Sequence, residues 1–253
     1  MCASQVCLTV GASLPWPPQL VQGSVAPTAG ATVSGGKLLL NSTRGGAIIS
    51  ILTRTGNSTV SLSLTNGVFT LPCASAKQTR LNASYSQLDC VVPPGGGSGY
   101  ALQIQFSNTT KSYSFTDGHS LAINYPLPTL NASSLSLLSG GAPSNTLQLQ
   151  NTVPTTVVFH GSNFYTPPTG FVSIHYGPAS NPMQFTCQID AAHSTWSQLA
   201  CATQGGALGS NLVFIVEVFG QTVVSTFVLN YPSNGSGASV CTIFRHVSWS
   251  QFR

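Results

Sequence analysis

Residues 184–232 read QFTCQIDAAHSTWSQLACATQGGALGSNLVFIVEVFGQTVVSTFVLNYP, and this stretch decides the fold. It contains two cysteines, Cys187 and Cys201, then a glycine-rich turn, a long β-rich run and a closing Asn-Tyr-Pro. The same plan occurs earlier, where Cys73 and Cys90 are followed by Pro-Pro-Gly-Gly-Gly, a β-rich run and another Asn-Tyr-Pro. The chain is therefore built on an internal repeat, which has to be recognised before a fold is assigned.

The repeat divides the 253 residues into four parts. Residues 26–126 and 127–232 form two units of about 100 residues, the size of an immunoglobulin-like domain. The first unit is the more degenerate of the two. Residues 1–25 are expected to be an irregular, proline-rich lead-in or the end of a preceding repeat. Residues 233–253 are expected to be a flexible linker and a short tail, because Asn-Gly-Ser-Gly is a linker composition.

Short strands are predicted throughout both units. Period-two alternation and β-branched runs mark five segments: 47–52, 60–64, 102–106, 156–159 and 172–176. Clusters of Gly, Pro and Asn separate the runs, and no stretch shows a capped helical period. The sequence thus predicts an all-β chain of tandem sandwiches.

The most apolar segment, residues 212–229, is predicted to be two strands. Glu217, Gly220 and Gln221 interrupt it, whereas a membrane-spanning helix needs about 20 predominantly apolar residues. We expect the turn between the two strands near Gly220.

Charge is scarce. Charged residues make up 5% of the chain, compared with roughly 25% in an ordinary soluble domain. A surface of hydroxyl and amide groups is typical of a secreted chain that carries glycans. Six sequons of the form N-x-[ST] favour the same location, and they begin at Asn41, Asn57, Asn82, Asn108, Asn131 and Asn234.

The two cysteine pairs favour one disulfide in each unit, which requires an oxidising compartment; four buried free thiols are the alternative. Closing a loop of about 15 residues would stabilise each unit by roughly 3 kcal/mol. Cys2, Cys7 and Cys241 are left over, and their pairing stays open. No signal peptide follows Met1. We therefore expect a fragment of a larger secreted or membrane protein, attached to a membrane only through parts outside this chain.

The second unit carries a set of short motifs. It begins with Pro-Thr at 128–129 and has Gly-Ser-Asn-Phe at 161–164, the cysteine pair and Asn-Tyr-Pro at 230–232. On these motifs residues 26–232 resemble the IPT/TIG family, an immunoglobulin-like fold shared by plexins and certain transcription factors. The first unit departs from the pattern at residues 54–57, where the aromatic is missing. The resemblance implies two immunoglobulin-like sandwiches in tandem.

Several motif residues have a structural interpretation. Phe164 and Tyr231 are expected to be core or corner aromatics. Gly161 is expected to permit a turn that other residues would strain.

No arrangement of residues predicts catalysis, a cofactor or a metal site. The acids are scattered, the five histidines follow no ligand spacing, and no nucleophile elbow is present. Asp89 and Asp190 are expected to be solvated loop acids. The glycines at 95–99 lack the Lys-Ser or Lys-Thr of a phosphate loop and are interpreted as loop glycines. Nucleic acid is not an expected partner, because residues 127–232 contain no Lys or Arg with which to contact phosphates.

The main hypothesis is a non-enzymatic extracellular module of a cell-surface protein that acts in adhesion or protein recognition. Candidate contact residues are Tyr165, at the start of the loop 165–168, and Trp196, because exposed aromatics anchor interfaces. A core position for Trp196 is the alternative. The second hypothesis is a carbohydrate-binding accessory module, with Tyr165, Trp196 and Tyr176 as the available sugar platforms.

Overall fold

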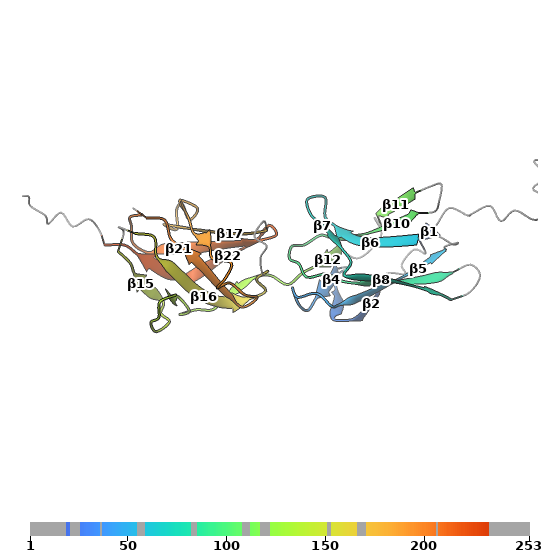
Figure 1. Cartoon of the computed structure of the whole chain (residues 1–253), viewed down its shortest axis with the longest axis horizontal. Coiled ribbons are helices and arrows are strands. Elements are labelled where there is room, and N and C mark those ends of the chain that lie inside the picture. The colour runs from blue at the N-terminus through green and yellow to red at the C-terminus, as the bar shows by residue number, and fades with distance from the viewer. Residues whose placement is uncertain are drawn as a thin grey trace, which may run out of the picture.

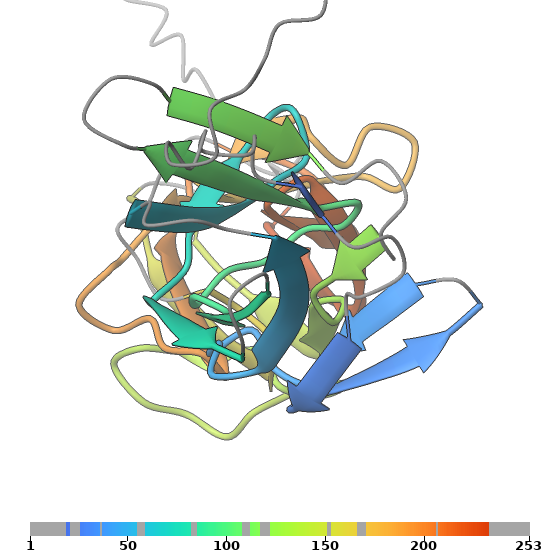
Figure 2. The same cartoon turned by 90° about the vertical axis from the view of Figure 1, so that its right-hand side faces the viewer.

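The structure is a computed structural model in which two β-sandwiches lie end to end (Figure 1). Figure 2 looks along the long axis, so that the amino-terminal sandwich stands in front of the other. The described residues are 19–20, 26–35, 37–54, 59–81, 85–107, 112–116, 122–150, 153–165, 171–205 and 207–232. Within these residues every regular element is a strand.

The carboxy-terminal sandwich consists of two five-stranded sheets. Its strands are β13 (Thr129–Leu130), β14 (Ser136–Leu137), β15 (Thr146–Gln148), β16 (Thr156–Ser162), β17 (Val172–Gly177), β18 (Phe185–Thr186), β19 (Gln188–Ile189), β20 (Gln198–Ala202), β21 (Leu212–Val218) and β22 (Gln221–Asn230). One sheet has the order β13-β16-β20-β19, with β14 also pairing with β16, and the other has the order β15-β22-β21-β17-β18. This is the A-B-E-D and C-F-G pairing of an immunoglobulin-like sandwich.

The amino-terminal sandwich repeats this plan. Its strands are β1 (Gln19–Leu20), β2 (Ala26–Ala29), β3 (Ala31–Ser34), β4 (Lys37–Leu40), β5 (Ile48–Arg54), β6 (Thr59–Thr65), β7 (Thr70–Pro72), β8 (Ser75–Arg80), β9 (Ser86–Val91), β10 (Ala101–Ser107), β11 (Ser112–Thr116) and β12 (Ala122–Asn124). The first sheet has the order β1-β5-β9-β8, and the second is β11-β10-β6-β7. β12 pairs in parallel with β4, just as β22 pairs in parallel with β15. The chain is therefore a tandem of immunoglobulin-like sandwiches.

One short element was not predicted. The lead-in was expected to be irregular, but Gln19 and Leu20 form β1 on the edge of β5. β2 covers only the first residues of β5, up to Ser50. The later backbone groups of β5, at Thr53 and Arg54, are left for β1 to pair with.

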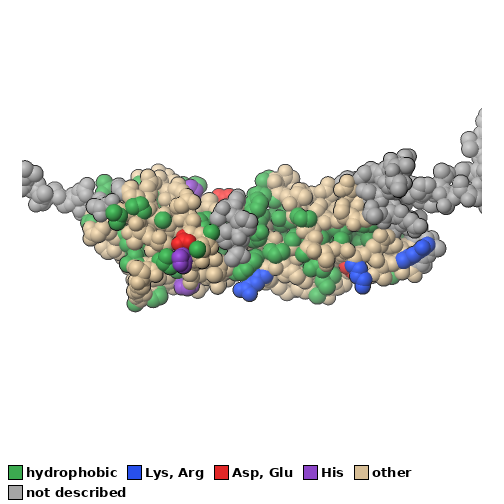
Figure 3. Space-filling model, in the orientation of Figure 1, with side chains coloured by type: hydrophobic (Ala, Val, Ile, Leu, Met, Phe, Trp, Pro, Cys, Tyr) green, Lys and Arg blue, Asp and Glu red, His purple; other side chains and the backbone are tan. Residues whose placement is uncertain are grey.

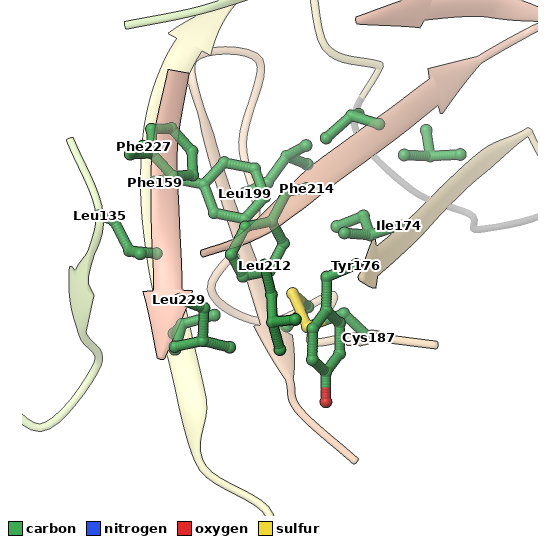
Figure 4. Close-up of a cluster of buried hydrophobic side chains, with 14 of the residues drawn as sticks. Leu135, Phe159, Ile174, Tyr176, Cys187, Leu199, Leu212, Phe214, Phe227 and Leu229 are labelled. Atoms are coloured by element: carbon green, nitrogen blue, oxygen red, sulfur yellow. A yellow bond between two sulfur atoms is a disulfide. The ribbon is translucent and has the colours of Figure 1, made fainter. Parts of the chain in front are cut away.

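Each sandwich has its own core, and strand alternation produces it. In β17 the side chains of Val172, Ile174 and Tyr176 are buried, while Ser173 and His175 between them are only half-buried. Figure 4 shows how such side chains from both sheets meet in the carboxy-terminal core, with the disulfide of Cys187 beside Tyr176. The core aromatics include Phe159, Phe164, Tyr176, Phe214, Phe227 and Tyr231, so the interpretation of Phe164 and Tyr231 as core residues is confirmed.

The structure contains both disulfides expected from the repeat, Cys73–Cys90 and Cys187–Cys201, with sequence separations of 17 and 14 residues. The second cysteine of each pair lies in a central strand, β9 or β20, and is completely buried. The first cysteine lies where the chain passes from one sheet to the other, after β7 or β18.

The main chain at this crossing has the same hydrogen bond in both sandwiches. Cys73 N–H donates to the Leu62 carbonyl at 2.9 Å, and Cys187 N–H donates to the Ile174 carbonyl at 2.9 Å. Leu62 and Ile174 belong to the sheet that the chain is leaving, whereas the disulfide joins the cysteine to the sheet that it enters. Each disulfide therefore fastens the two sheets of its sandwich together.

The apolar segment 212–229 folds as predicted. It forms β21 and β22, which pair as an antiparallel hairpin with Val218 opposite Gln221. Within the described part of the chain, no helix has the length and apolar character needed to cross a membrane.

Gly161 is required for a reason other than the expected turn. It lies within β16, and its φ is not in the left-handed region. A Cβ atom at this position would overlap the carbonyl oxygen of Thr129 and lie 2.5 Å from the ring of Phe164. The constraint is the close approach of β13 and the Phe164 ring to β16.

We expect Gly161→Ala to lower the free energy of unfolding by about 1–3 kcal/mol, because the added methyl group overpacks a closed site. Gly205→Ala is the matched control in the same sandwich, since its Cβ would lie 3.3 Å from Pro154 Cδ at an exposed position. Urea denaturation of both variants checks this prediction. Equal midpoints for the two variants would contradict it.

Candidate interaction surface at the junction of the sandwiches

The carboxy-terminal sandwich inserts a hairpin tip into the end of the amino-terminal one. The tip is the turn Phe219-Gly220 between β21 and β22, with φ values of 49° and 78°. Two positive φ values are what the tightest hairpin turn requires, and a bulky residue rarely adopts one. The strained turn places Phe219 at the junction, where its side chain is 3% exposed.

Glycines of the amino-terminal sandwich form the seat for this tip. A Cβ on Gly96 would lie 2.9 Å from Phe219 Cδ2 and 3.1 Å from Val218 Cγ1. Gly97 has a φ of +91°, and a Cβ there would lie 3.1 Å from the Phe219 carbonyl oxygen. The two glycines are buried, and a larger residue would push the tip away. The glycine-rich loop thus has a packing role that the sequence did not reveal.

Gln221 bonds the two sandwiches together at the same place. The N–H of Gly97 donates to Gln221 Oε1 at 3.1 Å, and Gln221 Nε2 donates to the Tyr125 carbonyl at 3.4 Å. The Gln221 side chain is 8% exposed, so both bonds are shielded from water. A buried amide whose two ends are satisfied fixes the orientation of the groups around it.

Five aromatic side chains gather beside this seat, and we call them the junction cluster. Four come from the carboxy-terminal sandwich and one from the amino-terminal sandwich: Tyr165, Phe171, Trp196, Phe219 and Phe69. Phe219 stacks on Phe171 with ring centroids 4.4 Å apart and meets Phe69 edge-on at 5.1 Å. Edge-to-face and offset stacks of this kind add to the energy of burial.

The two residues expected to contact a partner are brought together here. The rings of Tyr165 and Trp196 meet edge-to-face at 5.7 Å, and Tyr165 meets Phe219 in the same way at 5.1 Å. Trp196 is half-buried and is not a core residue. Residues 166–168 of the predicted loop lie outside the described residues.

Hydrogen bonds of the main chain hold the cluster residues in place. Phe164 N–H donates to the Trp196 carbonyl at 3.2 Å, which fixes the Trp196 loop against the end of β16. In the other sandwich the side chain of Asn66 accepts from the N–H of Phe69 at 2.8 Å, so the turn before β7 aims Phe69 at the junction. The cluster is therefore preorganised from both sides.

The cluster also has an exposed rim. The Phe171 side chain is 38% exposed, while Tyr165, Trp196 and Phe69 are half-buried. Hydrophobic side chains are visible along the junction in Figure 3. All four Lys and Arg residues with described side chains belong to the amino-terminal sandwich, namely Lys37, Arg44, Lys77 and Arg80.

Sequence reasoning missed Phe69, Phe171 and Phe219. A signal for Phe219 was present, because the sequence places this large aromatic next to Gly220 in the predicted hairpin turn, where Gly, Asn and Asp are the preferred residues. Phe69 and Phe171 carried no such signal in the sequence.

Tyr176 is a correction. It was expected to be an available sugar platform, but it is completely buried and lies in the core. Its hydroxyl bonds to the Tyr231 hydroxyl at 3.2 Å. Strand alternation explains this, because Tyr176 shares the inward face of β17 with Ile174.

Asp89 is a second correction. It is a half-buried residue of β9 and not a loop acid, and it accepts hydrogen bonds from Ser50 Oγ at 2.6 Å and from Gln87 Nε2 at 2.8 Å. Asp190 does lie outside the strands.

Asp190, His193 and Ser194 lie close together but are not linked as a catalytic triad. His193 Nδ1 lies 2.7 Å from Asp190 Oδ2, and this hydrogen bond lowers the pKa of Asp190. The neighbouring Ser194 hydroxyl donates to the Asp190 and Ala200 carbonyls instead of meeting the His193 ring. Among the described residues no group of His, Cys, Asp or Glu has the arrangement of a metal site.

Comparison with known proteins finds matches among solved structures only. No family model matches the chain, and no curated protein matches it. A titin fragment, A168169, is 12% identical with a TM-score of 0.34 and covers 80% of this chain and 100% of that chain. The plexin A4 extracellular region is 11% identical with a TM-score of 0.28 and covers 85% of this chain and 25% of that chain.

These TM-scores are below 0.5, so the likenesses carry no argument about this chain. The immunoglobulin-like fold rests on the strand order described above. Membership of the IPT/TIG family stays a prediction.

We expect Gln221→Ala to loosen the junction without unfolding either sandwich. The substitution removes both hydrogen bonds of the Gln221 side chain and leaves the Gly97 N–H without a partner. We therefore expect the hydrogen of that amide to exchange with water about tenfold faster. Hydrogen exchange followed by NMR measures this rate. Thr222→Ala, on the exposed side of the same strand, is the control and should leave the rate unchanged. Equal Gly97 exchange in the two variants would show that Gln221 does not hold the junction.

Proposed function

We propose that this chain is a non-enzymatic recognition module of an extracellular or cell-surface protein, and that the junction cluster contacts a protein partner. The observation that carries this proposal is the pairing of Tyr165 and Trp196, half-exposed beside Phe171 on a surface that both sandwiches build. Tyr and Trp are the residues that most often dominate the energy of protein interfaces.

Rigidity supports the same role. The seat of Phe219, with its buried hydrogen bonds to Gln221, holds the cluster in one geometry before a partner arrives. A preorganised surface binds more tightly, because less conformational freedom is lost on association.

The surroundings of the cluster favour a neutral partner surface. No member of the cluster is charged, and residues 127–232 contain no Lys or Arg. The partner need not bring a complementary charge, so we expect its contact surface to be apolar with hydroxyl and amide groups. Phosphate recognition would require clustered cations.

An extracellular location is part of the proposal. The two disulfides require an oxidising compartment. Two of the six sequon asparagines, Asn41 and Asn131, are exposed directly after β4 and β13. The other four, Asn57, Asn82, Asn108 and Asn234, lie outside the described residues, as do Cys2, Cys7 and Cys241.

The geometry gives less support to carbohydrate binding. A sugar platform needs a broadly exposed ring face, whereas Tyr165 and Trp196 stand at 86° to each other and are half-buried. Tyr176 is buried. Sugar binding is therefore an outcome that the functional test must be able to detect.

We expect the secreted full chain to contain Cys73–Cys90 and Cys187–Cys201 as disulfides, each stabilising its sandwich by roughly 3 kcal/mol. Peptide mapping by mass spectrometry, with and without reductant, identifies the bonds, and thermal unfolding measures the loss on reduction. Free thiols at these four positions in a folded product would contradict the extracellular location.

We expect Tyr165→Ala combined with Trp196→Ala to weaken partner binding by at least about 30-fold, the effect of losing an interface hot spot of about 2 kcal/mol. The full chain, displayed as a multimer, is screened against an array of receptor ectodomains and against a glycan array in parallel. Val224→Ser, at an exposed position of β22 in the same sandwich, is the control.

Thermal unfolding must show that the double variant is folded. If the double variant bound an ectodomain as tightly as the natural chain does, the junction cluster would not be the surface that contacts the partner. Binding to glycans alone, lost in the double variant, would replace the protein partner by a carbohydrate.

A further inference from the structure

The outward face of one sheet differs between the two sandwiches. The hydrogen bond at the crossing makes Leu62 and Ile174 equivalent positions, because each accepts from the first cysteine of its repeat. Ser63 and His175, the next residues along β6 and β17, are then equivalent as well. The outward faces of the sheets β11-β10-β6-β7 and β15-β22-β21-β17-β18 can therefore be compared position by position.

In the amino-terminal sandwich this face is polar. Ser63 Oγ donates to Gln103 Oε1 at 3.3 Å, and Ser61 Oγ donates to Gln105 Oε1 at 3.4 Å. Thr116 of β11 is the register partner of Gln103. Polar residues are usual on the solvated side of an antiparallel sheet. The fold of the repeat therefore needs no apolar side chain on this face.

In the carboxy-terminal sandwich the same face is aliphatic. The row that reads Ser-Gln-Thr across three strands of the first sandwich reads His-Ile-Val in the second, at His175, Ile215 and Val224. Val213 and its register partner Val228 extend the aliphatic patch along β21 and β22. Val224 is 52% exposed, and the other three aliphatic side chains are half-buried. A contiguous apolar patch that the fold does not need is typical of an interaction surface.

His175 brings to this face a polar group that its own sandwich leaves unpaired. Its Nδ1 atom is buried without a hydrogen-bond partner among the described residues, whereas Ser63 at the equivalent position is paired with Gln103. Buried N–H groups are rarely left without an acceptor, so we place the hydrogen of the neutral ring on Nε2. His175 thus offers a donor to a partner.

Glu217 offers the matching acceptor. It is the next outward residue of β21 after Ile215 and is half-buried. Among the described residues Glu217 has no ion pair and no side-chain hydrogen bond, and residues 127–232 contain no Lys or Arg. A carboxylate that is partly removed from water gains from a hydrogen-bond donor. Because Ile215 is the register partner of His175, Glu217 lies diagonally across from His175 at about 7–8 Å.

We propose that this face is a self-association surface, on which a second copy of the chain docks with the same face. Donor and acceptor lie side by side on one surface, and a two-fold dimer joins such a pair twice. A two-fold axis that lies between the two facing sheets and runs past Ile215 and Val224 sets His175 of each copy against Glu217 of the other. The same axis brings the Ile215 and Val224 side chains of both copies together at the centre.

The size of the face sets the strength of the dimer. β21 is 7 residues long, and with β17 and β22 it covers about 14 Å by 24 Å, or about 340 Å². A standard interface buries about 800 Å² on each partner. We therefore expect a weak dimer with a dissociation constant of roughly 100 µM. Several copies displayed on one surface would associate more strongly through avidity.

The surface does not include any of the five side chains of the junction cluster. Tyr165 follows β16 and Trp196 precedes β20, and both strands belong to the other sheet. Self-association is measured on the chain alone, so it stands or falls independently of the partner proposed for the cluster. Val224→Ser changes the self-association surface and leaves the cluster intact.

The test is sedimentation equilibrium of the secreted full chain from about 10 µM to about 1 mM, which brackets the expected dissociation constant. Free thiols are alkylated so that no intermolecular disulfide forms. The test variant combines Ile215→Gln with Val224→Thr, because the amino-terminal sandwich has these residue types at the equivalent positions. Val33→Ser is the matched control, since Val33 is also 52% exposed but lies on β3 of the other sandwich.

We expect the natural chain and Val33→Ser to dimerise alike, and the double variant to associate at least about tenfold more weakly. A natural chain that stays monomeric up to about 1 mM would overturn the proposal. A double variant that dimerises like the natural chain would overturn it too, because another surface would then be responsible.

Exchanging the two polar groups tests the two-fold arrangement. His175→Glu alone, or Glu217→His alone, sets like groups against each other, so each variant should associate at least about tenfold more weakly than the natural chain. In an equal mixture one copy supplies both acceptors and the other both donors, and association should return. Mixed variants, each folded by thermal unfolding, that associate no better than the separate ones would overturn the arrangement. If either is unfolded, the double variant decides the proposal by itself.

Discussion

The crossing between the two sheets at the first cysteine of each repeat is the constraint on which the structure depends. There the main chain is hydrogen-bonded to the sheet it leaves, and the sulfur is bonded to the sheet it enters. Cys73 and Cys187 both make these two attachments. Because both sheets are fixed to one residue, the inward faces of the strands are held at the spacing that their side chains fill. The core and the loops at both ends follow from that spacing.

The loops at the ends decide what the molecule presents. In the amino-terminal sandwich, burial raises the pKa of Tyr100 to about 12, and its hydroxyl donates to the Gly96 carbonyl within the glycine loop. This hydrogen bond holds the glycine loop in position, and the Phe219 tip packs against the loop. The result is a junction that is held by packing and by the hydrogen bonds of Gln221. A chain with 5% charged residues has little else to use.

The outer sheet faces show how the molecule manages with so little charge. Along β6 and β10 the hydroxyls of Ser61 and Ser63 donate to the side-chain oxygens of Gln105 and Gln103. Such pairs satisfy the hydrogen-bonding groups of the surface without adding charge. The junction cluster, where the two sandwiches meet, likewise contains no charged side chain.

The sequence by itself predicted the repeat, most of the strands and the favoured pairing of the cysteines, because these are local patterns: alternation within a strand, turn residues between strands, and the same motif twice. It also marked Tyr165 and Trp196, though not their contact with each other. Only the tertiary structure joined Phe69 to Phe219 and the glycine loop to Gln221, since these partners are far apart in the chain and no local period links them. It also showed that Tyr176 lies in the core and that Gly161 is required by close packing and not by a turn. The contacts across the junction depend on which surfaces of two folded sandwiches meet, and that is decided by shape after each sandwich has formed. The burial of Tyr176 and the close approach of Thr129 and Phe164 to Gly161 depend instead on how strands pack within one sandwich.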